Sequence, residues 1–154
     1  MTSPAVPVLR RILVAGCSMA TTLLAACALR SETSVPRVAI QQSWARIADS
    51  GATSGAYMDI VNNDTVPITL VGITTSDASA AEVHETMQQD GMAHMMPRTA
   101  LRIPAGDVVR MTPGGLHVML IDLRRTLVVG DSVRLRLQFS DSTIVAATVP
   151  VKTP

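Results

Sequence analysis

The chain has 154 residues, a formal net charge of +1 and an aromatic content of only 2%, although 47% of its residues are hydrophobic. Residues 1–27 contain two arginines and no acidic residue, so removing them lowers the charge to −1. This balance excludes the strongly basic surface that is typical of a nucleic-acid-binding protein. The length fits a single domain, whose core must be built largely from Val, Leu, Ile and Met.

The N-terminus has the pattern of a secretory signal. Arg10 and Arg11 precede an apolar run, residues 12–26, that is too short to span a bilayer comfortably. The run ends in the letters LAAC at Cys27, which resemble the lipobox of bacterial lipoproteins, in which the cysteine is lipidated and becomes the first mature residue. We therefore expect a lipoprotein signal peptide over residues 1–26 and a lipid anchor on Cys27.

Two alternatives to this anchor remain. A second lipobox-like match ends at Cys17, but it leaves too short an apolar run after the arginines. An ordinary cleaved signal with an incidental Cys27 would release a soluble periplasmic protein. In either case the expected location is extracytoplasmic, at the periplasmic face of a bacterial membrane if acyl chains hold it there. Ala28 in place of an aspartate favours sorting to the outer membrane.

No cysteine follows Cys27, so a domain that starts there has no disulfide, thiolate zinc site or cysteine nucleophile. We expect residues 27–36 to form the lipidated cysteine and a tether, and residues 37–152 to form the folded domain.

The folded domain is expected to be all-β. Short runs rich in Val, Ile and Thr alternate with turn residues, and no long apolar stripe with helical spacing follows the signal. Eight to nine short strands in this length are typical of an antiparallel β-sandwich or barrel. The expected strands are 37–46, 55–61, 68–75, 81–87, 92–96, 108–112, 116–123, 132–139 and 144–151.

Histidine and methionine gather in the stretch HETMQQDGMAHMM, residues 84–96. A four-residue hairpin loop at 88–91 would place His84 opposite Met95 on the neighbouring strand, with Cβ atoms roughly 4.5–5.5 Å apart. A two-residue turn at Asp90 and Gly91 would instead leave His84 diagonal to Met95.

A second histidine–methionine pair lies downstream, in the alternating strand LHVMLIDL. His117 and Met119 are two residues apart and so share one face of that strand. Thioether sulfur is soft and neutral, and neutral imidazole also suits copper, so two such pairs favour Cu(I) over Zn²⁺, Mg²⁺ or Ca²⁺. A site without thiolates also fits an oxidising compartment.

The spacing of these four residues resembles the signature of the periplasmic copper chaperones called PCuAC: His, ten residues, Met, twenty-one residues, His, one residue, Met. His84, Met95, His117 and Met119 match all four positions. The stretches SWARIADSGATSGAYMDIVNND and MTPGGLHVMLIDLRRTLVVGDSVRLRLQFSD also resemble family segments.

The resemblance implies a cupredoxin-like β-sandwich with an exposed Cu(I) site. It also implies a monomeric chaperone that delivers copper to the CuA subunit of cytochrome c oxidase, or to another copper chaperone. The chain departs from many members at Met96, where they have Arg or Lys, and it ends without a tail rich in His and Met.

Four further residues of the cluster are candidates for an auxiliary copper role, although methionine also fills core gaps where aromatics are scarce. They are Met87, Met92, His94 and Met96. Trp44 is expected to pack in the core or near the site, and Arg46 and Tyr57 are expected to belong to the fold.

We do not expect an enzyme. The sequence has no nucleophile elbow, phosphate-binding loop or zinc-binding helix motif. Glu82 and Glu85 flank His84 and are expected to point away from it, to the opposite face of the strand. The alternatives to delivery are a copper storage or resistance lipoprotein and a structural lipoprotein whose Met and His residues only pack.

Overall fold

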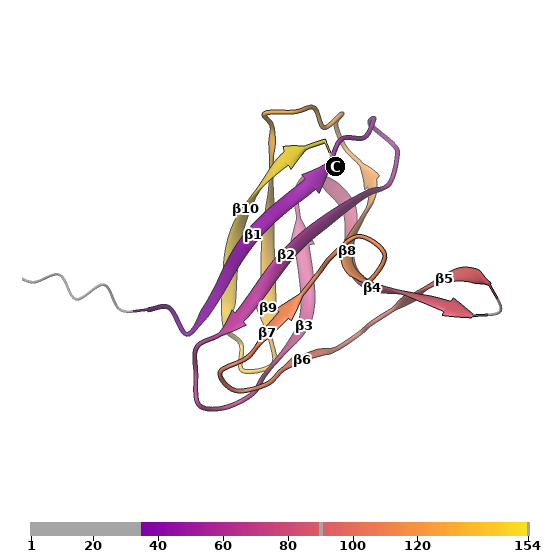
Figure 1. Ribbon diagram of the computed structural model, residues 1–154. Coiled ribbons are helices and arrows are strands. Elements are labelled where there is room, and N and C mark those ends of the chain that lie inside the picture. The colour runs from indigo at the N-terminus through magenta and orange to yellow at the C-terminus, as the bar shows by residue number, and fades with distance from the viewer. Residues whose placement is uncertain (1–34, 90, 154) are drawn as a thin grey trace, which may run out of the picture. The chain divides into compact units, whose positions relative to one another are not determined.

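Ten strands pair into one sheet within residues 35–89 and 91–153, the part of the chain that the computed structural model describes (Figure 1). The expected signal peptide, Cys27 and most of the tether lie outside the described residues. The strands are β1 (Val38–Arg46), β2 (Ser54–Asn62), β3 (Ile68–Thr75), β4 (Ala78–Gln89), β5 (Met92–Pro97), β6 (Leu101–Ile103), β7 (Val108–Arg110), β8 (Leu116–Leu123), β9 (Ser132–Phe139) and β10 (Ile144–Lys152).

The sheet closes on itself. Its order is β5-β4-β8-β2-β1-β10-β9-β3-β6, and β3 also pairs with β4 through Ile73 and Ala81. The all-β prediction is confirmed. One detail differs from the expected antiparallel arrangement, because β1 and β10 run parallel. These are the first and last strands of the domain, so no short hairpin connects them and their relative direction is free of that constraint.

The core lies inside this closed sheet and is almost entirely aliphatic. Strand β9 illustrates the alternation: Val133, Leu135, Leu137 and Phe139 are at most 1% exposed, while the residues between them point outward. The strand period of two therefore assigns the core face directly from the sequence.

A β-bulge in β1 reverses this alternation. Val38 and Ile40 lie on the core side, but the pairing with β2 shifts between Gln41 and Trp44, where Gln42 has a φ of 50°. The extra residue moves Trp44 from the core phase to the outer face, opposite Tyr57, and leaves Ala45 fully buried instead.

Strand β6 is the one strand that the sequence did not predict. It has only three residues, Leu101–Ile103, and lies between Pro97 and Pro104, so it shows no run of alternation. Within the described residues, no helix is long and apolar enough to cross a bilayer.

The far end of β4 and all of β5 form a hairpin that extends away from the rest of the sheet (Figure 1). Every residue of β5 is exposed. The hairpin therefore adds little to the core and presents both of its faces to solvent.

Candidate metal centre

The two candidate histidines lie directly opposite each other. His84 on β4 pairs with His117 on β8, and two residues earlier Glu82 pairs with Met119. Directly opposite residues on neighbouring strands share a face, so all four side chains lie on the outer face of the closed sheet. The His84 and His117 ring centroids are 6.1 Å apart. Residues separated by more than thirty positions in sequence are thus brought within reach of one ion.

Met95 reaches the same face from the hairpin, but by a different register from the expected one. Gln89 pairs with Met92, and Met95 pairs with Thr86. The prediction of a four-residue loop is wrong, and the alternative prediction of a two-residue turn is confirmed. Gly91, with a φ of 76°, suits the second position of such a turn, because glycine adopts this conformation without a steric penalty.

The direct partner of His84 on β5 is Pro97. Met95 lies two positions before Pro97 and is therefore diagonal to His84. Diagonal neighbours are about 7–8 Å apart, which remains within reach of a long side chain. Methionine has three rotatable bonds and adapts to such gaps.

One pocket collects three of the four candidate ligands, and His84 is not among its lining residues. Met95, His117 and Met119 all line it, together with Tyr57 and Arg46. His117 is only 8% exposed and His84 has a 12% exposed side chain, whereas Met95 is 58% exposed. Both imidazoles are therefore largely buried, and Met95 lies at the open edge of the pocket.

Hydrogen bonds fix which nitrogen of each histidine is free. The Nδ1 of His117 lies 3.0 Å from the carbonyl oxygen of Gly115, which can only accept, so Nδ1 carries the proton and Nε2 keeps its lone pair. The Nε2 of His84 lies 3.0 Å from a carboxylate oxygen of Glu82 and donates to it. In the neutral ring, His84 Nδ1 is then the nitrogen that keeps its lone pair, and it is buried without any hydrogen-bond partner.

Glu82 lies on the same face as His84, contrary to the expectation from the sequence. It was expected on the face opposite His84, but the two residues are two positions apart and share a face. The alternation that put His117 and Met119 on one face would have identified it. Glu85, an odd number of positions away, does lie on the other face and pairs with Met96.

An aromatic row supports His117 from the other side. Trp44 and Tyr57 lie opposite each other on β1 and β2 with ring centroids 4.5 Å apart, and the Tyr57 ring is 6.3 Å from that of His117. Of the two expected locations for Trp44, the one near the site is correct. Gly55 makes room for this row, because a Cβ there would lie 2.8 Å from the Tyr57 hydroxyl oxygen.

The four auxiliary candidates do not share the face of His84 and Met95. Met87 pairs with His94, Gln89 with Met92 and Glu85 with Met96, so all four candidates point to the opposite side of the hairpin. The register therefore separates them from the pocket.

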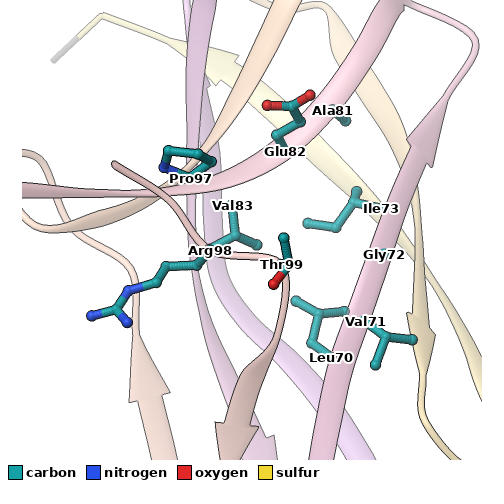
Figure 2. Close-up of a pocket in the computed structure, with 10 residues that line it drawn as sticks. All are labelled: Leu70, Val71, Gly72, Ile73, Ala81, Glu82, Val83, Pro97, Arg98 and Thr99. Carbon is teal, nitrogen blue, oxygen red and sulfur yellow. The ribbon is translucent and has the colours of Figure 1, made fainter. Parts of the chain in front are cut away.

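The described residues offer no alternative site built from hard ligands. Within residues 35–89 and 91–153, no group of three or more His, Cys, Asp or Glu is placed to hold a metal ion. A larger apolar pocket lies between β3, β4 and the segment after β5, with Leu70, Ile73 and Val83 among its walls (Figure 2). None of the four candidate ligands lines it.

The sequence of residues 38–151 matches the protein family described as "Putative lipoprotein LpqE-like". The chain belongs to the LpqE-like family. A relative from Leifsonia xyli subsp. xyli (strain CTCB07), named "Putative lipoprotein Lxx21020", is 36% identical over 116 residues, which make up 75% of this chain and 69% of the relative.

Solved structures extend the comparison of this LpqE-like chain. The copper-bound PCuAC domain from PmoF2 is 26% identical, with a TM-score of 0.64 over 78% of this chain and 96% of that domain. The CuI-DR1885 protein from Deinococcus radiodurans is 30% identical, with a TM-score of 0.59 over 80% of this chain and 83% of that protein. The resemblance to the PCuAC family and its cupredoxin-like fold is confirmed.

Proposed function

We propose that this LpqE-like chain is an extracytoplasmic Cu(I)-binding metallochaperone. The proposed ligands of its copper site are His84, Met95, His117 and Met119. The observation that carries the proposal is the direct pairing of His84 with His117, each with one ring nitrogen left free. Two imidazoles and two thioethers form a neutral, soft ligand set that suits Cu(I).

The buried, unpartnered Nδ1 of His84 fits a metal-bound nitrogen. A buried polar atom normally has a hydrogen-bond partner, and an exception is explained when a ligand supplies the missing contact. Glu82 would act on the other side of the ring, as carboxylates do in many histidine metal sites, by holding the tautomer and the ring orientation.

The open edge of the site suits transfer. Met95 is exposed on a strand that lies at the end of the sheet order, so an acceptor's ligands can approach the ion from that side. We propose associative ligand exchange, in which an incoming ligand binds before Met95 leaves. The chain would bind and hand over copper, with no chemical conversion.

The proposed acceptor is the CuA subunit of cytochrome c oxidase, or another copper chaperone that precedes it. The proposed location is the periplasmic face of a bacterial membrane, with the chain held there through lipidated Cys27. Both the description of the matching family and the name of the Leifsonia relative refer to lipoproteins, which supports the anchor.

Metal competition and transfer together test this function. Under anaerobic conditions the domain should retain Cu(I) in the presence of equimolar Zn²⁺, and equal retention of both metals would favour a structural lipoprotein. The Cu(I)-loaded domain should then metallate a purified, copper-free CuA domain. Retention of all copper against that acceptor would favour storage or resistance instead of delivery.

A further inference from the structure

The second face of the β4–β5 hairpin carries its own group of soft ligands. Met87, Met92, His94 and Met96, here called the hairpin face, alternate with the residues that point toward the pocket. Met87 and His94 are directly opposite each other, so their Cβ atoms are roughly 4.5–5.5 Å apart. Met92 and Met96 lie two positions to either side of His94 on the same face.

These methionines do not fill gaps in the core. Met87 is 50% exposed, Met92 61% and Met96 53%, whereas Met58 and Met111 are nearly fully buried. Among the described residues, every exposed methionine belongs to this hairpin. Packing, the alternative reading of the cluster, therefore does not explain why methionines occupy these positions.

Among the described residues, the hairpin face offers soft donors, and the one carboxylate that shares the face is already paired. Glu85 shares the face and pairs with Met96, but its carboxylate accepts a hydrogen bond from Arg98 Nε at 2.7 Å and forms an ion pair with the same guanidinium. The metal donors that remain on this face among residues 84–89 and 91–97 are one imidazole and three thioethers. This combination favours Cu(I) over harder divalent metals.

We propose that the hairpin face is a second Cu(I) site, separate from the pocket and weaker than it. His94 and Met87 supply two ligands from opposite strands, and Met92 or Met96 supplies the third from beside His94. The site is weaker because its side chains are exposed, and binding an ion removes the conformational freedom that exposed side chains have. The proposal rests on the Cu(I) chemistry proposed for this chain, but on none of the four ligands proposed for the first site.

Three variants of the domain test the second site by anaerobic Cu(I) titration against a chromogenic Cu(I) chelator. The hairpin-face variant replaces each methionine of that face by leucine and His94 by glutamine. The pocket variant makes the same exchanges at His84, Met95, His117 and Met119, and a third variant combines both sets. Met111→Leu controls for the loss of a thioether away from both sites, since exchanges that conserve volume are well tolerated.

We expect two equivalents of Cu(I) bound to the wild type and to Met111→Leu, one to each single-site variant and none to the combined variant. The equivalent kept by the pocket variant should be the one that the chelator removes more easily. In that variant, Cu(I) should shift the NMR signals of the Met87 methyl group, of the Met92 or Met96 methyl group, and of the His94 ring.

The two proposals fail in distinguishable ways. If the wild type and the hairpin-face variant bind the same number of equivalents, the second site is wrong and the pocket is unaffected. If the pocket variant binds as tightly and as much as the wild type while the hairpin-face variant binds nothing, the proposed pocket is wrong and the hairpin face is the copper site. Unshifted methyl and His94 signals in the pocket variant would also overturn the second site.

Discussion

His84 and His117 face each other across β4 and β8, and each ring is held by a protein oxygen at a different nitrogen. Glu82 holds Nε2 of His84, and the Gly115 carbonyl holds Nδ1 of His117. The free nitrogens are therefore Nδ1 on one ring and Nε2 on the other. A single ion between them requires both tautomers, so the hydrogen bonds that set them become part of the site.

Substitution of Glu82 should weaken copper binding without unfolding the domain. Removing a carboxylate that orients a metal-bound histidine typically lowers metal affinity by about 10–100-fold. We expect a loss of this size for Glu82→Ala and a smaller loss for Glu82→Gln, whose amide oxygen can still accept from Nε2–H. Anaerobic competition titration measures the affinities, and nitrogen-15 NMR of His84 reports the tautomer.

Glu85 is the matched control, because it lies one strand position beyond His84 on the opposite face. Glu85→Gln should leave the affinity of the pocket unchanged. Equal affinities for Glu82→Ala and the wild type, or an equal loss in Glu85→Gln, would refute the positioning role of Glu82.

Gly55→Ala should disturb the aromatic row next to His117. The new methyl group would lie 2.8 Å from the Tyr57 hydroxyl oxygen and 3.2 Å from the adjacent ring carbon, and Trp44 limits the retreat of the ring. We expect a loss of about 1–3 kcal/mol in the free energy of unfolding, as for other overpacked sites. Chemical denaturation measures it.

Tyr57→Phe removes the hydroxyl oxygen, which is the atom nearest to the new methyl group. In the Gly55→Ala background it should therefore restore part of the lost free energy of unfolding, which a double-mutant cycle measures. Gly72→Ala is the control, since the nearest atom to its Cβ would be 3.9 Å away. Equal destabilisation by the two glycine substitutions would contradict the proposed crowding.

Asp131 should stabilise the domain at neutral pH and lose that effect in acid. The backbone N–H of Val128 and the Arg125 guanidinium hydrogen-bond to its carboxylate and lower its pKa. A pKa lowered by folding stabilises the folded state above the unfolded pKa, and this contribution is lost as the pH falls through the folded pKa.

Asp131→Asn should therefore unfold at a lower temperature than the wild type at pH 7. The difference should shrink well below about pH 4, near the ordinary pKa of an aspartate. A difference in melting temperature that stays constant from neutral to acidic pH would argue against the charge as its cause.

Cys27→Ser should release the protein from membranes or block its processing, because the expected lipid anchor needs the thiol. Fractionation of cells that produce the full chain measures this, with Cys17→Ser as the matched control that should stay membrane-bound. A wild-type protein found entirely in the soluble fraction, with an unmodified Cys27, would overturn the anchor.

The sequence predicted most of the fold because its strands alternate clearly. Nine of the ten strands coincide with expected runs, and only the three-residue β6 was too short to show a pattern. The facing of His117 and Met119 followed from the same period of two. The resemblance to the PCuAC signature selected His84 and Met95, and the structure places both on the same outer face as His117 and Met119.

The sequence could not predict features that depend on how strands pair. The bulge at Gln42 moves Trp44 to the outer face, and nothing in the local pattern marks it. The pairing of His84 with His117 joins distant segments, so no local rule yields it. The hairpin register depends on a choice between two turn lengths, and that choice decides whether Met95 lies directly opposite His84 or diagonal to it.

X-ray absorption spectroscopy tests most directly the claim that four residues form one copper site. It is measured on the wild-type domain and on four single variants, each loaded with one equivalent of Cu(I). Met95→Leu and Met119→Leu conserve volume and should cost under about 1.5 kcal/mol of stability, so changes at copper can be separated from unfolding. His84→Gln and His117→Gln complete the set.

The wild type should show a mixed shell of imidazole nitrogen and thioether sulfur. Each methionine variant should lose sulfur scattering, each histidine variant should lose imidazole scattering, and all four should bind Cu(I) more weakly than the wild type. A wild-type shell and wild-type affinity in all four variants would contradict the proposed copper site.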